Sequence, residues 1–372
     1  MPRAARRLVA LTPVALSLVA LNLLAPALAA RAQTQDQAPA SQEVPPASAL
    51  RSFFSGNPQT STRAPIGGPA LLLMGGGPEV DAAFTQQALV VANGGDVVVL
   101  RISGGAGYQA YLLDELMRAL PAERRAALQP NSVTTLIVDS RAHADNEAVA
   151  ARVARANLVW IAGGNQALYI AAWQDTRLAR AVRAAYARGA VIGGTSAGMV
   201  VIGGWMYDNG VHEGVTSAQA VADPYRADVR LQPGIFGLPL ADGLLADTHF
   251  ANRDRMGRLL AFMARVRQDG QARRVIGVAL DEGTSLFIDR DGAGHFGRQR
   301  GSGSGYVVQE DALTGRTRVQ PGQPLLYRQL QRSRLHLPGQ TFDFARGVAG
   351  PGVLTRALSV EGAPPPAADA YE

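Results

Sequence analysis

The sequence predicts an α/β fold, with a mostly parallel sheet covered by helices on both faces and a small antiparallel C-terminal extension. Three observations favour this class. Short apolar runs recur along the chain, segments with helical periodicity lie between them, and from about Phe287 the pattern changes to short Gly- and Arg-rich pieces. Continuous apolar strands that alternate with helices are typical of a parallel sheet buried on both faces.

The apolar runs and the periodic segments place the individual elements in chain order. The strands expected are Ala70–Met74, Asp96–Ile102, Val133–Val138, Leu158–Ala162, Ala190–Gly193 and Val275–Leu280. The helices expected between them include Val80–Asn93, Tyr111–Leu120, Asn146–Ala156 and Thr176–Arg188. About 300 residues remain for this fold after the N-terminal segments, enough for a substantial core.

The first 32 residues have the features of a cleavable signal peptide. A positively charged start is followed by Leu8–Ala30, which carries no charge, and small residues at Ala27-Leu28-Ala29 and Ala30-Arg31-Ala32 offer cleavage sites. An uncleaved membrane anchor is the alternative, but the uncharged run is interrupted by Pro13, Asn22 and Pro26. We therefore expect a bacterial periplasmic or secreted protein with no stable membrane insertion after cleavage.

Composition divides the rest of the chain. Residues 33–69 are rich in Gln, Ala, Pro and Ser and predict a disordered linker. Residues 70–310 form the expected main folded domain, residues 311–360 a C-terminal extension, and residues 361–372, which contain three consecutive prolines, a disordered tail.

Residue usage excludes several kinds of chemistry. The chain has no cysteine, so disulfides, thiolate metal sites and cysteine nucleophiles are excluded. All 36 basic side chains are arginines, and no basic stripe interleaved with aromatic residues occurs. We expect no cofactor, no metal and no nucleic-acid partner.

The motif Gly194-Thr195-Ser196-Ala197-Gly198 fits the G-x-S-x-G pattern of a nucleophile elbow. An expected strand precedes it and an apolar stretch that can begin a helix, Ala197–Met206, follows. Such a turn lifts the serine hydroxyl out of the sheet, and the flanking glycines leave room for it. Ser196 is therefore the candidate nucleophile.

A serine nucleophile needs a base, usually histidine, and an acid that orients the base. Of the five histidines, His249 is favoured as the base over His143, His212, His295 and His336. An alternative stays open, in which Asp247 caps a helix and His249 is a half-buried residue with no catalytic role. The apolar run Val275–Leu280 ends in Asp281 and Glu282. Adjacent strand residues point to opposite sides, so these two acids should not share one role.

Two further glycine-rich turns follow expected strands. Gly163-Gly164-Asn165-Gln166 can expose a backbone N–H opposite the elbow and so contribute to an oxyanion site. Gly75-Gly76-Gly77 could cradle a phosphate, but it lacks the G-x-G-x-x-G spacing and the chain has no lysine. Nucleotide binding is therefore not expected.

Four motifs in one order resemble cyanophycinase-like peptidases of the S51 group. They are Gly163-Gly164-Asn165-Gln166, Gly194-Thr195-Ser196-Ala197-Gly198, Asp247-x-His249-Phe250-x-x-Arg253-x-Arg255-x-x-Arg258-Leu259 and Gly277-Val278-Ala279-Leu280-Asp281-Glu282. The resemblance spans about Ala70 to Gly305 and implies a class I glutamine amidotransferase-like sandwich and a serine exopeptidase.

The resemblance also implies roles for individual residues. Ser196 would be the nucleophile, His249 the base and Glu282 the residue that orients it. Backbone N–H groups of Gly164, Asn165 and Ala197 would hold the oxyanion. The substrate pocket would be lined by Gln166, Asp247, Thr248, Arg253, Arg255 and Arg258. The arginines suit carboxylates, because guanidinium forks pair with them in two-point geometry.

The substrate implied is cyanophycin, which is poly-aspartate carrying arginine on its side chains, or a related aspartyl-rich peptide. One departure is that Thr248 stands where the family has glutamine, which removes an amide's donors and acceptors. Another β-aspartyl or acidic peptide therefore stays open as the substrate in place of cyanophycin. A homodimer stays open.

Two other functions stay open. An α/β-hydrolase-type esterase also uses G-x-S-x-G, but its order of serine, acid and histidine would require His295 or His336 as base. A catalytically inactive amidotransferase-like binding domain would keep the pocket without turnover. The intact Ser, His and Glu positions argue against it.

Export can be tested directly. We expect the mature protein to begin near Ala29 or Ala32, because the uncharged run ends in paired small-residue sites. N-terminal sequencing of the exported protein checks this, and a product that still begins at Met1 or Pro2 would support the membrane anchor instead.

Overall fold

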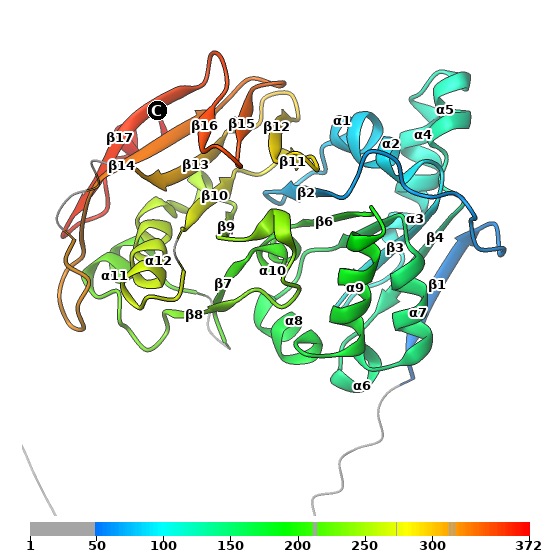
Figure 1. Cartoon of the computed structure of the whole chain (residues 1–372), viewed down its shortest axis with the longest axis horizontal. Helices are drawn as coiled ribbons and strands as arrows, with labels where there is room; N and C mark the ends of the chain where they lie inside the picture. Colours follow the sequence, from blue (N-terminus) through cyan, green and yellow to red (C-terminus); the bar gives the residue numbers. More distant parts are fainter. Residues whose placement is uncertain (1–48, 211–213, 273, 312–313, 315–316) are drawn as a thin grey trace, which may run out of the picture. The chain divides into compact units, whose positions relative to one another are not determined.

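The computed structural model describes residues 49–210, 214–272, 274–311, 314 and 317–372 (Figure 1). The expected signal peptide, residues 1–32, and the first part of the expected linker lie outside these residues. The elements form two sheets, and the part described belongs to one compact unit that runs from Ala47 to Glu372. The α/β class expected from the sequence is confirmed.

The first sheet has ten strands with a parallel core. The core order is β4 (Ser132–Ile137), β3 (Asp96–Arg101), β5 (Leu158–Ile161), β6 (Val191–Thr195) and β2 (Ala70–Met74). Antiparallel strands extend it on both sides: β1 (Arg51–Gly56) beside β4, and β11 (Thr284–Ile288), β12 (Ala293–Arg298), β15 (Thr341–Asp343) and β16 (Val348–Ala349) beyond β2.

Helices cover both faces of this sheet. On one face Leu72 packs in a cluster with Phe84 and Trp160, and on the other Leu71 packs in a cluster with Val182 and Met199. The helices are α1 (Asp81–Ala83), α2 (Leu89–Ala92), α3 (Gly107–Ala110), α4 (Leu116–Arg118), α5 (Ala122–Leu128), α6 (Arg141–Ala144), α7 (Glu147–Arg155), α8 (Gln166–Trp173), α9 (Arg177–Ala187) and α10 (Ala197–Ile202), with π-helical turns at Phe84–Ala88 and Tyr111–Glu115. Because neighbouring strand residues point to opposite faces, continuous apolar runs supply both cores.

The second sheet has seven strands and was not expected as a separate sheet. Its order is β17 (Leu354–Glu361), β14 (Leu326–Leu335), β13 (Gly305–Glu310), β10 (Ile276–Leu280), β9 (Leu244–Thr248), β7 (Trp205–Asp208) and β8 (Arg230–Pro233). Strands β10, β9 and β7 are parallel, and the others pair antiparallel. The apolar run at 275–280 thus lies in the second sheet, because hydrophobicity predicts a buried strand but not its partner.

Helices α11 (Ser217–Ala222) and α12 (Met256–Gln268) share an apolar cluster with this second sheet, in which Leu259 and Phe262 meet Tyr306 and Val308. The chain returns to the first sheet through the short turn between β10 and β11. Glu282 lies in that turn, between the two sheets.

The ends of the described chain differ from the sequence expectations. Within the expected linker, β1 pairs with β4 over six residues, from Arg51 opposite Ile137 to Gly56 opposite Ser132. Within the expected tail, α13 (Ala367–Tyr371) carries Tyr371, whose hydroxyl accepts the N–H of Met256 at 3.0 Å. Both segments gain order from distant partners, which local composition does not reveal.

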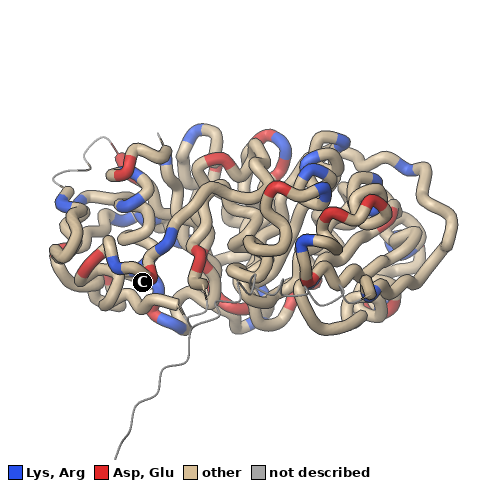
Figure 2. The backbone as a smooth tube through the Cα atoms, turned by 90° about the horizontal axis from the view of Figure 1, so that it is seen from below, with Lys and Arg blue, Asp and Glu red and all other residues tan. Residues whose placement is uncertain are grey.

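The antiparallel C-terminal extension expected from the sequence is present. Strands β14 and β17 pair antiparallel and continue the same sheet that holds β9 and β10. In the described chain, no helix has the length and apolar character needed to cross a membrane. Figure 2 shows that arginines and acidic residues are interspersed along the described chain.

Candidate active site

Ser196 lies on a sharp turn between β6 and α10, as the motif predicted. Its backbone has φ 54° and ψ −124°, a conformation that residues with a side chain rarely adopt. The flanking glycines permit the turn by close packing. A Cβ at Gly198 would collide with the carbonyl oxygen of Ile161, and one at Gly194 would lie 2.6 Å from the carbonyl carbon of Gly198.

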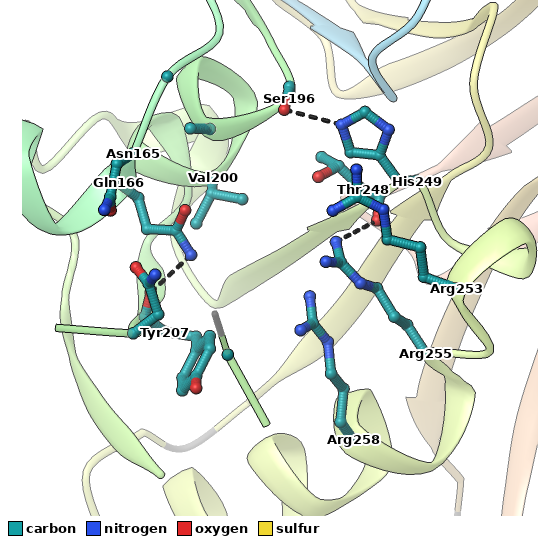
Figure 3. Close-up of a pocket in the computed structure, with 14 residues that line it drawn as sticks. Asn165, Gln166, Ser196, Val200, Tyr207, Thr248, His249, Arg253, Arg255 and Arg258 are labelled. Carbon is teal, nitrogen blue, oxygen red and sulfur yellow. Dashed lines mark hydrogen bonds between the residues drawn. The ribbon is translucent and has the colours of Figure 1, made fainter. Parts of the chain in front are cut away.

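The structure brings Ser196, His249 and Glu282 together. Ser196 Oγ lies 2.9 Å from His249 Nε2, and His249 Nδ1 lies 2.6 Å from Glu282 Oε1. Figure 3 shows the serine hydroxyl and the imidazole facing each other. A carboxylate at Nδ1 favours the tautomer that carries its proton there, which leaves Nε2 free to accept the serine proton.

The neighbouring acid, Asp281, has different partners. Its carboxylate is buried and accepts the N–H groups of Ala251 at 2.7 Å and of Ser304 at 2.8 Å. Burial raises the pKa of Asp281, and the two N–H groups oppose that rise. Asp281 therefore ties the segment after His249 to the turn that carries Glu282.

A turn that sequence reasoning did not connect with the serine holds all three groups. The carbonyl oxygens of Met74, Gly75 and Gly76, at the end of β2, accept the N–H groups of Ser196 at 3.1 Å, His249 at 2.9 Å and Gly283 at 2.8 Å, respectively. The run of three glycines was the available signal, since it also fits the opening strand and turn of the family that the chain resembles, but the sequence does not show which segments it contacts. Its observed position is beneath the imidazole and the Glu282 side chain.

Gly164, Asn165 and Ala197 lie beside the serine on the wall of a cavity of about 400 Å³. Asn165 caps α8, because its side chain accepts the N–H of Ala167 at 2.9 Å. Ala197 is the first residue of α10, and the first N–H groups of a helix have no partner within it. The backbone around the serine thus offers donors to a developing oxyanion.

The cavity is lined mainly by polar groups. Figure 3 shows a row of three arginines on one wall, with Gln166 and Tyr207 on the other. The lining residues are Gly164, Asn165, Gln166, Ser196, Ala197, Val200, Tyr207, Asn209, Gly214, Thr248, His249, Arg253, Arg255 and Arg258. Five of the six residues expected in the substrate pocket are among them, and Asp247 is not.

Asp247 lies behind the arginines instead of lining the cavity. It is almost fully buried and accepts two hydrogen bonds from Arg258, Nε to Oδ2 at 2.8 Å and Nη2 to Oδ1 at 2.5 Å. Arg255 Nη1 lies 3.5 Å from the same carboxylate and donates to the Thr248 carbonyl at 2.7 Å. The buried carboxylate of Asp247 therefore compensates the charge of Arg258 and helps to orient Arg255. The sequence placed Asp247 in the motif but could not show which side of the arginines it occupies.

Arg253 lies four residues after His249, a spacing that would place both on one helix face if a helix already began there, but the local structure is different. Helix α12 begins only at Met256, so Arg253 lies in a short 3₁₀ turn and Arg255 at the helix cap. The chain turns sharply before this, with φ 48° at His249. This turn, and not a continuous helix face, places Arg253 and His249 on the same cavity.

Four lining residues were missed by sequence reasoning: Val200, Tyr207, Asn209 and Gly214. Tyr207 stacks on Phe262 with ring centres 4.6 Å apart, and its hydroxyl accepts the N–H of Val215 at 3.0 Å. It reaches the cavity only because β7 pairs beside β9 in the second sheet. The sequence carries no local signal for that pairing.

The other described histidines have their own partners. His143 lies 2.8 Å from Asp139, His295 lies 3.1 Å from Asp289, and His336 Nδ1 lies 3.1 Å from the Ser304 hydroxyl. His212 lies outside the described residues. The esterase-type order would need His295 or His336 at the serine, whereas the observed neighbour of Ser196 is His249. Among the residues that the structure describes, no group of three or more metal-ligating side chains is found.

The surroundings of His249 lower its pKa below the usual 6.5. Burial is the largest cause, since it disfavours the charged imidazolium, and the positive charges of Arg253 and Arg255 act in the same direction. The hydrogen bond to Glu282 and its negative charge oppose the shift. The imidazole is therefore neutral at pH 7 and able to accept a proton.

Comparison with known proteins points to one family. Residues 122–295 match the model of peptidase family S51. Cyanophycinase of Synechococcus elongatus is 32% identical over 208 residues, which cover 55% of this chain and 58% of that protein. Cyanophycinase of Trichormus variabilis is 29% identical over 208 residues, 55% of this chain and 62% of that protein. The resemblance expected from the motifs is confirmed.

The matched region is limited. The chain spans less than two thirds of the length of these relatives. A solved peptidase structure from an acI-B1 Actinobacterium shares 16% identity over 74% of this chain and 97% of that one, with a TM-score of 0.42.

The lowered pKa of His249 predicts a pH dependence for serine reactivity. Only the neutral imidazole accepts the serine proton, so the rate rises as pH increases through the His249 pKa. We expect the midpoint of this rise below 6.5 in the wild-type protein. Arg253→Gln removes a charge that lowers this pKa, so its midpoint should move upward. The rate of Ser196 labelling by a fluorophosphonate between pH 4 and 9 measures both.

Arg118→Gln is the matched control, because it removes an arginine from α4 that does not line the cavity. Its midpoint should equal that of the wild type. A midpoint at or above 6.5 in the wild type, or no movement in Arg253→Gln, would contradict the electrostatic account.

Proposed function

We propose that this chain is an exported serine exopeptidase that hydrolyses cyanophycin or a related β-aspartyl or acidic peptide. The observation that carries the proposal is the run of hydrogen bonds from Ser196 through His249 to Glu282 at the wall of an arginine-lined cavity. The match to peptidase family S51 supports the reaction class. The charged start of the chain and its uncharged run support export.

The geometry accounts for acyl transfer. Ser196 Oγ attacks the substrate carbonyl while His249 Nε2 takes the hydroxyl proton, and Glu282 holds the resulting imidazolium. Backbone N–H groups at Ala197 and in the Gly164–Asn165 turn stabilise the oxyanion of the tetrahedral intermediate. His249 then gives its proton to the leaving amine as the C–N bond breaks, which leaves an ester on Ser196. Water, activated by the same imidazole, hydrolyses that ester and regenerates the hydroxyl.

The cavity supports an acidic substrate. Arg258 is already paired with Asp247, so most of its charge is compensated. Arg253 and Arg255 add positive charge that faces the cavity beside His249. Burial lowers the pKa of Arg255 to about 10, which still leaves it charged at pH 7. A carboxylate next to the scissile bond would meet these guanidinium groups in two-point geometry.

The substrate proposal can be tested with purified protein. Cyanophycin and a panel of α- and β-aspartyl dipeptides are incubated with the mature chain, and the products are identified by mass spectrometry. Release of dipeptides from the polymer supports the cyanophycin assignment, and cleavage of the dipeptides alone supports a smaller acidic substrate. No cleavage of any member, with a correctly folded protein, would overturn the proposal.

Ser196→Ala should abolish turnover because it removes the attacking atom. In triad enzymes such a loss is on the order of a million-fold in kcat. His249→Ala should fall to a similar level, and the double variant should be little worse than either single one. Steady-state kinetics on the cleaved substrate measure these rates, and additive losses would mean that the two residues do not act as a unit.

Arg255→Lys should weaken substrate binding more than the chemical step, because lysine keeps the charge and loses the guanidinium fork. A charge-assisted hydrogen bond is worth about 1.5–3 kcal/mol, so KM should rise roughly ten- to a hundredfold. Arg253→Lys should show the same direction of change. Arg118→Lys on α4 serves as the control and should match the wild type. If both cavity variants show wild-type kinetics on every acidic peptide, the proposed role of the arginines in substrate binding is contradicted, whereas the serine mechanism is not.

A further inference from the structure

We infer that Gly76 is a positioning residue for the serine site, whose lack of a side chain lets His249 reach Ser196. The inference rests on the proposed function in one respect, because a change in the reaction rate can be seen only if Ser196 is the nucleophile. The placement of His249 against Gly76 rests on the geometry alone. Gly76 belongs to the glycine run after β2, which fits the opening strand and turn of the family but has no role in the serine chemistry described above. It lies in a turn that contacts the backbone of all three elements carrying the site.

The backbone contacts set the relative positions of those elements. Successive carbonyl groups of Met74, Gly75 and Gly76 accept one N–H each from Ser196, from His249 and from Gly283, the residue after Glu282. The serine follows β6 in the first sheet, the histidine follows β9 in the second, and the acid lies between β10 and β11. The turn after β2 therefore holds three segments that are distant in sequence at fixed positions relative to one another.

The imidazole packs directly on Gly76. A Cβ added there would lie 2.6 Å from Nε2 and 3.1 Å from Nδ1 of His249, whereas ordinary van der Waals contact begins at 3.4 Å. Nε2 is the atom that faces the Ser196 hydroxyl at 2.9 Å. A methyl group at this position would displace the ring from both Ser196 and Glu282. The backbone φ of 100° at Gly76 also favours glycine.

The neighbouring glycines have different contacts, so the effect on His249 is expected at Gly76 and not at Gly75 or Gly77. A Cβ at Gly75 would meet the backbone carbonyl groups of Leu280 and Asp281, so substitution there would disturb the strands themselves. A Cβ at Gly77 would lie 3.0 Å from the Cβ of Glu282. Only at Gly76 is the obstructed atom part of the histidine ring.

The test compares Gly76→Ala with wild type by two readouts. The first is the rate of fluorophosphonate labelling at saturating reagent. A ring displaced by about 1 Å should lower it on the order of a hundredfold, with little change in the apparent affinity for the reagent. The second is the NMR signal of the His249 Nδ1 proton, assigned by its loss in His249→Ala. This signal should move upfield in Gly76→Ala because the 2.6 Å contact with Glu282 is lost.

Gly339→Ala is the matched control. Gly339 has a similar φ of 86°, is exposed, and has no atom within 4 Å of an added Cβ, so this variant carries the backbone strain without the contact. Both of its readouts should equal those of wild type. If Gly76→Ala does not fold, thermal unfolding of Gly76→Ala/His249→Ala decides, because this double variant removes the ring that the added methyl group would meet. It should be more stable than Gly76→Ala, and no gain in stability would overturn the inference.

The outcomes separate this inference from the proposed function. If wild type is not labelled, the serine mechanism fails, and the imidazole signal alone then decides whether Gly76 positions His249. If wild type is labelled, a wild-type labelling rate or an unchanged Nδ1 signal in the folded variant overturns the inference. A slower rate together with a shifted signal, both absent in Gly339→Ala, supports it.

Discussion

The backbone at the end of β2 is the interaction on which the rest of the site depends. Three consecutive carbonyl groups, from Met74 to Gly76, bind the N–H groups of Ser196, His249 and Gly283. Hydrogen bonds between backbone groups have little freedom in length and direction, so they fix segments more firmly than flexible side chains can. Because β2 pairs with both β6 and β11, the same strand also joins the serine's strand to the strand that follows Glu282.

The two residues that would exchange the proton both have a strained backbone. Ser196 and His249 both have positive φ, at 54° and 48°, and conformations of this kind cost about 1–3 kcal/mol each. These strained conformations persist because the packing and hydrogen bonds around each residue prevent the backbone from relaxing. The elbow is closed by glycines packed against Ile161, and the His249 turn is held at Gly75 on one side and through Asp281 at Ala251 on the other.

The electrostatic arrangement of the cavity follows from what is buried and what is paired. Asp247 compensates the deepest arginine, Arg258, so that a guanidinium can be buried at acceptable cost. Arg253 and Arg255 then leave positive charge at the cavity, and this charge lowers the pKa of His249 together with burial. Glu282 opposes that shift and keeps the imidazole oriented. The charges that would meet the proposed acidic substrate thus also help to set the protonation state of the base.

The α/β class, the parallel core strands and the serine elbow could all be predicted from the amino-acid sequence, because each depends on a local pattern of residues. The expected strand Ala70–Met74 is β2 with the same bounds, since a strand buried on both faces must be a continuous apolar run. Tertiary structure alone decided the second sheet, the position of Asp247 behind the arginines, the order in β1 and α13, and the place of Gly76 against His249. These features depend on which distant segments pair, and neither hydrophobicity nor spacing along the chain encodes a strand's partner or the side from which a side chain is approached.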